Sequence, residues 1–238
     1  MKLILSGGGI GEKCHTSYKK FAEELKERKV LFVPFANDEM TYQEALEWFK
    51  GQVNPYGINN IIMIENPQEL TKELLKSVGG VYVSGGNTFQ LLKELKSCNA
   101  FNVMKEFLNE DSIIMGGSAG ATVFGKSIDT CLMDDLKIIA SDKNNVGLKE
   151  TDGFNAVCGY SFFVHYRVKE RQYEDTEKRV QRLLSDGHNL ICLPEETSLY
   201  IEHGRMSIIG TLPAEIITKT TRFQIKPNEQ LNNKVMGE

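Results

Sequence analysis

The chain has 238 residues, of which 41% are hydrophobic and 25% charged, and its formal net charge is −4. These values suit one fairly large domain over residues 1–238, although two small domains would also fit. The slightly acidic balance gives no electrostatic reason to expect a nucleic-acid partner. No apolar run reaches the roughly 18 residues that a membrane-spanning helix needs, so we expect no membrane partner.

Five cysteines occur without a CxxC pair, and four histidines occur without an HExxH motif. An odd number of widely spaced cysteines argues against structural disulfides and against a zinc site. The apolar stretch within residues 1–6 is too short for the core of a secretory signal. We therefore expect a cytoplasmic protein that needs no metal and no cofactor.

In the first half of the chain, short apolar runs alternate with amphipathic segments. The apolar runs predict strands at residues 2–5, 30–35, 60–64, 81–83 and 112–115. Apolar residues three or four apart predict helices at residues 16–28, 41–50, 70–77, 89–95 and 101–108. Fully apolar strands separated by helices indicate a doubly wound, mostly parallel sheet that is covered on both faces.

The second half is less regular. It predicts a loop leading into residues 136–140, an extended segment at 157–166, a helix at 173–186 and a core strand at 190–194. Short runs at 198–202, 206–209 and 215–218 are separated by turn residues, which predicts an antiparallel extension of the same sheet. No repeat or linker marks a domain boundary.

Three glycine-rich turns, at residues 7–9, 85–87 and 116–120, each follow a predicted parallel strand. Doubly wound sheets place their sites outside the carboxyl ends of the strands, so we expect the three turns to meet at one edge. The first turn does not match a phosphate-binding loop, because Glu12 and Cys14 flank Lys13 where Gly and Ser or Thr are required.

The run Gly116-Gly117-Ser118-Ala119-Gly120 matches the Gly-x-Ser-x-Gly pattern of a nucleophile elbow. In such an elbow the serine sits in a strained turn between strand and helix, so its hydroxyl is exposed for attack. Ser118 is therefore the candidate nucleophile. The pattern alone leaves open a strand–helix turn without chemistry.

A serine nucleophile needs a general base, and the base needs an orienting acid. His165 ends an apolar run, as expected for a base that leaves a strand end, whereas His188 and His203 fall in turns. A satisfied structural histidine remains the alternative for His165. The candidate acids between serine and histidine are Asp129, Asp134 and Asp135.

An oxyanion hole needs two preorganised backbone N–H groups. The residue after the nucleophile, Ala119, supplies one of them. The turn at residues 84–87 is a candidate for the other, because glycine lets a backbone amide approach the substrate closely. The alternative is a plain strand–helix turn in which Asn87 caps the helix.

The runs Val83-Ser84-Gly85-Gly86-Asn87-Thr88-Phe89-Gln90-Leu91-Leu92, Gly117-Ser118-Ala119-Gly120-Ala121 and Leu193-Pro194-Glu195 resemble the dipeptidase E (α-aspartyl dipeptidase) family of serine peptidases. Cyanophycinase is a more distant relative of that family. The likeness runs in the same order through most of the chain. It implies a class I glutamine-amidotransferase-like α/β fold and a Ser–His–Asp triad that hydrolyses short peptides. We expect a monomer or a homodimer.

Carried onto this sequence, the resemblance implies Ser118 as nucleophile and His165 as base. It also implies that the amides of Gly86 and Ala119 bind the oxyanion.

The family's Asn-Asp-hydrophobic step matches Asp134-Asp135-Leu136, which favours Asp135 as the acid. Because the spacing from the serine is two residues longer here, Asp134 remains the alternative.

Family members that prefer an N-terminal aspartate carry an Arg-Glu-Gln-Arg run, whose first arginine binds the substrate carboxylate. The matching run here begins with Thr176, and a neutral hydroxyl cannot replace that ion pair. The resemblance therefore does not carry aspartyl specificity to this chain. Arg167, Lys169 or Arg171 could compensate, with ordinary surface roles as the alternative. The candidate substrate-binding residues are Asn87, Thr176 and Arg171.

Two other functions remain open on the sequence. One is hydrolysis of another acyl substrate, as an esterase or amidase, and the other is a non-catalytic binding protein on the same fold. An amidotransferase is disfavoured, because that chemistry uses a cysteine at the elbow.

Overall fold

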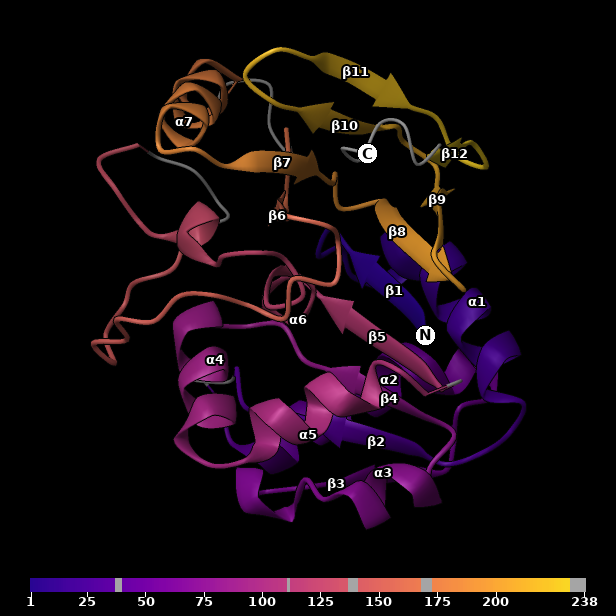
Figure 1. The fold of residues 1–238 in the computed structure, drawn as a ribbon. Helices are drawn as coiled ribbons and strands as arrows, with labels where there is room; N and C mark the ends of the chain where they lie inside the picture. The colour runs from indigo at the N-terminus through magenta and orange to yellow at the C-terminus, as the bar shows by residue number, and fades with distance from the viewer. Residues whose placement is uncertain (37–39, 111, 137–140, 168–172, 232–238) are drawn as a thin grey trace.

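A computed structural model describes residues 1–36, 40–110, 112–136, 141–167 and 173–231. Within this described part, the strands form two sheets (Figure 1). The larger has the order β12-β9-β8-β1-β5-β4-β2-β3, and the smaller has the order β11-β10-β7-β6. The strands are β1 (Lys2–Ser6), β2 (Val30–Val33), β3 (Ile61–Met63), β4 (Gly80–Val83), β5 (Ile113–Gly117), β6 (Tyr160–Phe163), β7 (Asn189–Cys192), β8 (Thr197–Glu202), β9 (Arg205–Gly210), β10 (Ala214–Ile217), β11 (Arg222–Ile225) and β12 (Gln230–Leu231).

The helices connect and cover these strands. They are α1 (His15–Leu25), α2 (Tyr42–Val53), α3 (Lys72–Ser77), α4 (Thr88–Ser97), α5 (Ala100–Phe107), α6 (Ala119–Thr122) and α7 (Tyr173–Ser185), with 3₁₀ turns at Gly11–Cys14, Asn54–Tyr56, Pro67–Glu69 and Asp129–Cys131. No helix in the described residues has both the length and the apolar character needed to cross a membrane.

The parallel part of the larger sheet consists of β1, β5, β4, β2 and β3. Side chains alternate across it. Ile4 joins the core under α1 and α2, where Phe21 and Phe49 are fully buried, while Leu3 and Leu5 join the core under the helices α3 to α5. Helices therefore cover both faces, and the predicted doubly wound α/β sheet is confirmed.

The C-terminal strands divide between the two sheets. β8 and β9 extend the larger sheet antiparallel from β1, as predicted, and β12, which was not predicted, continues it. β7 and β10 instead pair in the smaller sheet, where β6 and β7 run parallel and are joined through α7. The prediction of one extended sheet is wrong in this respect. The apolar run at residues 190–194 marks a buried strand, but it does not indicate which partner the strand pairs with.

One apolar core continues from the larger sheet into the smaller one, including Leu5 of β1, Phe162 of β6 and Ile191 of β7. This shared core holds the carboxyl ends of β1 and β5 close to the segments that follow β6 and β7. Of the loop predicted to lead into residues 136–140, residues 137–140 lie outside the described part of the chain.

Candidate active site

The turn between β5 and α6 has the geometry of a nucleophile elbow. Ser118 has φ 53° and ψ −114°, a left-handed conformation that is strained for a residue with a side chain. Its backbone N–H donates to the carbonyl of Ser6 at 3.1 Å, which ties the turn to the end of β1. A Cβ at Gly116 would overlap the carbonyl oxygen of Gly120, so the close approach of the two backbones requires glycine at this position.

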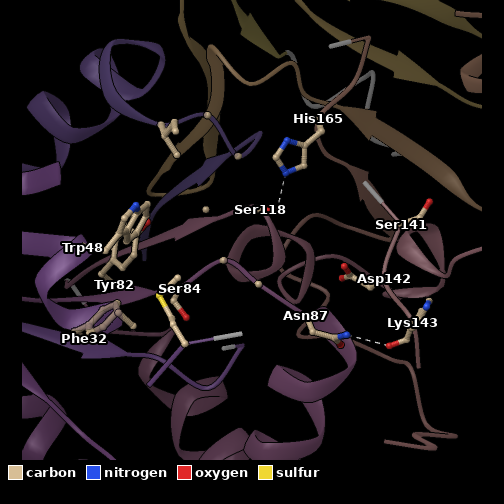
Figure 2. Close-up of a pocket in the computed structure, with 18 of the residues that line it drawn as sticks. Phe32, Trp48, Tyr82, Ser84, Asn87, Ser118, Ser141, Asp142, Lys143 and His165 are labelled. Atoms are coloured by element: carbon tan, nitrogen blue, oxygen red, sulfur yellow. Dashed lines mark hydrogen bonds between the residues drawn. The ribbon is translucent and has the colours of Figure 1, made fainter. Parts of the chain in front are cut away.

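His165 lies beside the serine. Its Nε2 is 2.9 Å from the Ser118 hydroxyl oxygen (Figure 2). His165 follows β6 and also has a positive φ of 51°, and its backbone N–H donates to the carbonyl of Gly7 at 2.9 Å. A Cβ on Gly8 would lie 2.5 Å from the imidazole, so this glycine leaves the space that the ring occupies. The structure thus brings together the predicted nucleophile and the predicted base.

The carboxylate that contacts the imidazole belongs to Glu195, in the segment between β7 and β8. His165 Nδ1 is 2.8 Å from Glu195 Oε1, and Lys13 Nζ is 2.5 Å from Glu195 Oε2. With the Nδ1 hydrogen directed at the carboxylate, Nε2 is left to accept the proton of Ser118. The four side chains form a continuous chain of hydrogen bonds from Ser118 to Lys13.

The ionisation of Glu195 follows from its partners. Burial raises the pKa of this carboxyl group, but hydrogen bonds from Lys13 and His165 outweigh burial, and its pKa lies below the ordinary range. Glu195 is therefore ionised at neutral pH, in the state that can hold an imidazolium in place.

The structure corrects our prediction of the orienting acid. Asp135 is 76% exposed and pairs with Arg182 at 2.5 Å, and Asp134 pairs with both Arg179 and Arg182. These ion pairs fasten the loop before residue 137 to α7. Arginine forms strong, geometrically matched pairs with carboxylates, so the arginines of α7 hold both side chains. Neither Asp135 nor Asp134 accepts a hydrogen bond from His165.

The contact between Glu195 and His165 was not predicted, because we expected the acid to lie between serine and histidine in the chain. Two signals in the sequence pointed to Glu195. It belongs to the Leu193-Pro194-Glu195 run that carries part of the family resemblance, and it directly follows a predicted core strand, where sites of parallel sheets lie.

The predicted oxyanion donors lie in strained or terminal backbone positions. Gly86 has φ 134°, and a Cβ there would overlap the carbonyl of Ala36. Ala119 is the first residue of α6. Among the described residues, the amides of Gly86 and Ala119 have no hydrogen-bond acceptor, whereas the adjacent amides of Asn87 and Ser118 each donate to a carbonyl. Two unengaged N–H groups beside the nucleophile suit an oxyanion.

Asn87 acts as a helix cap and a tether. Its Oδ1 accepts from the Gln90 N–H at 3.0 Å, and its Nδ2 donates to the Lys143 carbonyl at 3.0 Å (Figure 2). Asp142 accepts from the Thr88 N–H and hydroxyl at 2.8 and 2.6 Å. Residues 141–145 are thereby held against the start of α4. Asn87 lines the cavity, but these hydrogen bonds match the cap that the sequence left as the alternative.

Of the other predicted substrate-binding residues, the structure describes Thr176 and does not bring it to the site. Thr176 is 4% exposed within α7 and is not among the described residues that line the cavity. Arg171 and Lys169 lie outside the described residues. Arg167 pairs with Glu177 and Glu215, both at 3.0 Å, in ion pairs that engage its guanidinium.

A cavity of about 620 Å³ opens over Ser118 and His165. Figure 2 shows Phe32, Trp48 and Tyr82 gathered on one side of Ser118, and Asp142 and Lys143 on the other. In the described part of the chain, no group of three or more His, Cys, Asp or Glu side chains is arranged to hold a metal ion.

Comparison with known proteins gives consistent results. The sequence profile described as "Peptidase family S51" matches residues 3–209. The chain is 25% identical over 199 residues to Peptidase E of Haemophilus influenzae, covering 81% of this chain and 85% of that protein. It is 26% identical over 222 residues to Peptidase E of Shewanella putrefaciens, covering 89% and 88%.

Two solved structures have a similar fold. A peptidase from an acI-B1 actinobacterium matches with a TM-score of 0.72 and 19% identity, over 97% of this chain and 96% of that one. A Listeria monocytogenes EGD-e protein described as a peptidase E matches with a TM-score of 0.69 and 23% identity, over 88% and 98%. At these identities the likeness shows a common fold.

Proposed function

Because the chain belongs to peptidase family S51 and is a serine-type peptidase, we propose that it hydrolyses short peptides through Ser118, His165 and Glu195. The observation that carries this proposal is the chain of hydrogen bonds Ser118–His165–Glu195, with distances of 2.9 and 2.8 Å. It has the nucleophile, base and orienting acid of a serine-protease triad, with glutamate in the acid's place.

In the proposed reaction, the Ser118 oxygen attacks the peptide carbonyl while His165 Nε2 takes its proton. Glu195 stabilises the imidazolium that forms and keeps the ring in the productive orientation. The amides of Gly86 and Ala119 bind the negatively charged oxygen of the tetrahedral intermediate. His165 then gives the proton to the leaving amine, and a water molecule hydrolyses the acyl-enzyme by the same route.

The test is turnover of a dipeptide library, with p-nitrophenyl esters included, by the wild type, Ser118→Ala and Ser77→Ala. Ser77 is an exposed serine on α3 and serves as the matched control. We expect Ser118→Ala to lose at least about 10³-fold in kcat and to lose labelling by a fluorophosphonate, while Ser77→Ala keeps both.

Equal residual turnover in the wild type and Ser118→Ala would show that the serine mechanism is wrong. Hydrolysis of the esters alone would move the proposal from peptides to other acyl substrates.

A further inference from the structure

One end of the catalytic cavity is built from aromatic side chains that the proposed mechanism does not use. Phe32 comes from β2, Tyr82 from β4, and Trp48 from α2, so three separate elements converge there. In Figure 2 they form a group on the opposite side of Ser118 from Asp142. Of these side chains, Trp48 has exposed surface, whereas Phe32 and Tyr82 are buried.

This aromatic end is rigid. Phe49 stacks on Phe32 with ring centroids 4.7 Å apart, and on Tyr82 at 4.2 Å. Phe32 and Tyr82 are buried at 0% and 2% exposure, whereas Trp48, at 37%, has part of its indole facing solvent. A ligand side chain that enters would cover the indole without repacking the wall, which lowers the entropic cost of binding.

The aromatic end is adjacent to the reacting bond. A Cβ on Gly117, the residue before the nucleophile, would lie 3.3 Å from the Tyr82 hydroxyl oxygen. A side chain lodged against Tyr82 therefore belongs to a residue next to the attacked carbonyl.

The same cavity contains a buried hydroxyl whose hydrogen bonds the described residues do not satisfy. Ser84, directly after β4, is 4% exposed and lines the cavity, and its Oγ has no hydrogen-bond partner among the residues that the structure describes. An unsatisfied buried hydroxyl is costly, so its position in a ligand cavity indicates that a bound group supplies the missing hydrogen bond. The peptide backbone of a substrate offers such groups.

The charged side chains among the described lining residues do not favour an acidic occupant at this end. Their carboxylate and ammonium groups are those of Asp142 and Lys143, and both lie across Ser118 from the aromatic group (Figure 2). A substrate carboxylate placed against Trp48 would lose water without gaining a counter-charge from the described lining residues.

We propose that Trp48, with the buried rings of Phe32 and Tyr82 beside it, forms a subsite for an aromatic or large aliphatic side chain next to the scissile bond of the peptide. This specificity rests on the proposed peptidase function.

Binding tests the subsite without turnover. Trp48 is the chain's single tryptophan, so its fluorescence reports directly on occupation of the aromatic end. In the Ser118→Ala variant, we would titrate Phe-Ala, Ala-Phe, Ala-Ala and Asp-Ala. We expect one of the Phe-containing peptides to shift Trp48 emission and to bind about tenfold tighter than Ala-Ala and Asp-Ala. Asp-Ala binding as tightly as both Phe peptides, or no change in Trp48 emission with any peptide, would overturn the proposal.

Kinetics then separate the subsite from the mechanism. Trp48→Ala is expected to lower kcat/KM about tenfold for the preferred Phe peptide but less than about threefold for Ala-Ala, and Trp48→Phe to restore most of the loss. Leu132→Ala is the control, since this apolar side chain is 41% exposed and lies outside the described cavity lining.

The possible failures differ. An equal loss on both peptides in Trp48→Ala would contradict the subsite and leave the peptidase function standing. Selective Phe-peptide binding in Ser118→Ala, with no peptide turnover by the wild type, would contradict the peptidase function and leave the subsite standing.

Discussion

Ser118 lies at the end of β5 in the larger sheet. His165 follows β6 of the smaller sheet, and its backbone N–H donates to the carbonyl of Gly7, in the first loop of the larger sheet. Glu195 lies between them, after β7 of the smaller sheet and before β8 of the larger. The proposed nucleophile is therefore positioned by local strand–helix geometry. The proposed base and acid are positioned by the way the two sheets dock.

The loop after β1 forms the seam of that docking. The Gly7 carbonyl accepts from His165 N–H, and the Gly7 N–H donates to the Thr197 carbonyl at 2.9 Å. A Cβ at Gly7 would overlap the carbonyl of Pro194. Variants at Glu195, Gly8 and Lys13 test three contacts across this seam, and a variant at Glu24 tests one contact remote from it.

The largest expected effect comes from the acid at the seam. Glu195→Gln removes the ionised partner of His165, and we expect kcat to fall by about 10²–10⁴-fold with the fold intact. Asp135→Asn is the matched control, because Asp135 pairs with an arginine on α7, and we expect kcat to stay within about threefold of the wild type. A larger loss of kcat in Asp135→Asn than in Glu195→Gln would indicate that Asp135 is the acid.

A second test moves the histidine by filling the space beside it. Gly8→Ala places a Cβ 2.5 Å from the imidazole, and we expect kcat to fall by about 10- to 100-fold as the ring is displaced. Gly57→Ala is the control, since Gly57 also has a positive φ but has open space around its Cβ position. Alanine at a positive φ is strained, so both variants should lose about 1–3 kcal/mol of stability, which their denaturant midpoints would measure. Equal kcat in the two variants would contradict the close packing at the seam.

A smaller effect is expected at Lys13. Its ammonium helps to hold the pKa of Glu195 low, so Lys13→Met lets this carboxylate take up a proton at a higher pH. We expect kcat to fall about threefold at pH 7 and more steeply than the wild type as the pH is lowered toward 5, with Lys13→Arg close to the wild type. Parallel pH profiles for Lys13→Met and the wild type would show that the contact does not tune the acid.

The smallest effect lies away from the seam and concerns stability. Glu24 on α1 binds Lys2, Lys20 and Tyr200; burial raises the pKa of its carboxyl group, but these hydrogen bonds lower it to about 2. Because the pKa is lowered, the stabilisation is present above its ordinary value and is lost as pH falls from about 4.5 toward 2. Glu24→Gln should cost about 1 kcal/mol at pH 7 after solvent screening.

Chemical denaturation of Glu24→Gln across this pH range would measure the difference, which should shrink toward pH 2. The same variant should keep wild-type kcat, because α1 lies outside the docking of the two sheets. A loss of kcat in Glu24→Gln would mean that the larger sheet does not hold its nucleophile independently.

The sequence predicted what depends on local pattern. Apolar runs and 3.6-residue periodicity located the strands and helices, and Gly-x-Ser-x-Gly located the elbow at Ser118. His165 followed from a strand end. The identity of the acid depends on contacts between segments remote in sequence. Asp134 and Asp135 pair with Arg182 of α7, which lies 48 and 47 residues further along the chain. The sheet to which β7 belongs also could not be predicted from local pattern, because the sequence of a buried strand has the same apolar character in either sheet.

The hydrogen-bond chain behind Ser118 ends at Lys13, whose side chain is 44% exposed, while the His165–Glu195 contact is largely buried. Raising the ionic strength from 0.01 to 1 M shortens the Debye length from about 30 Å to about 3 Å, which weakens exposed ion pairs far more than buried ones. Through the exposed Lys13, the electrostatic environment of Glu195 therefore depends on the ionic strength of the solution. Dissolved salt can therefore act on this site through Lys13, which is not among the described residues that line the cavity.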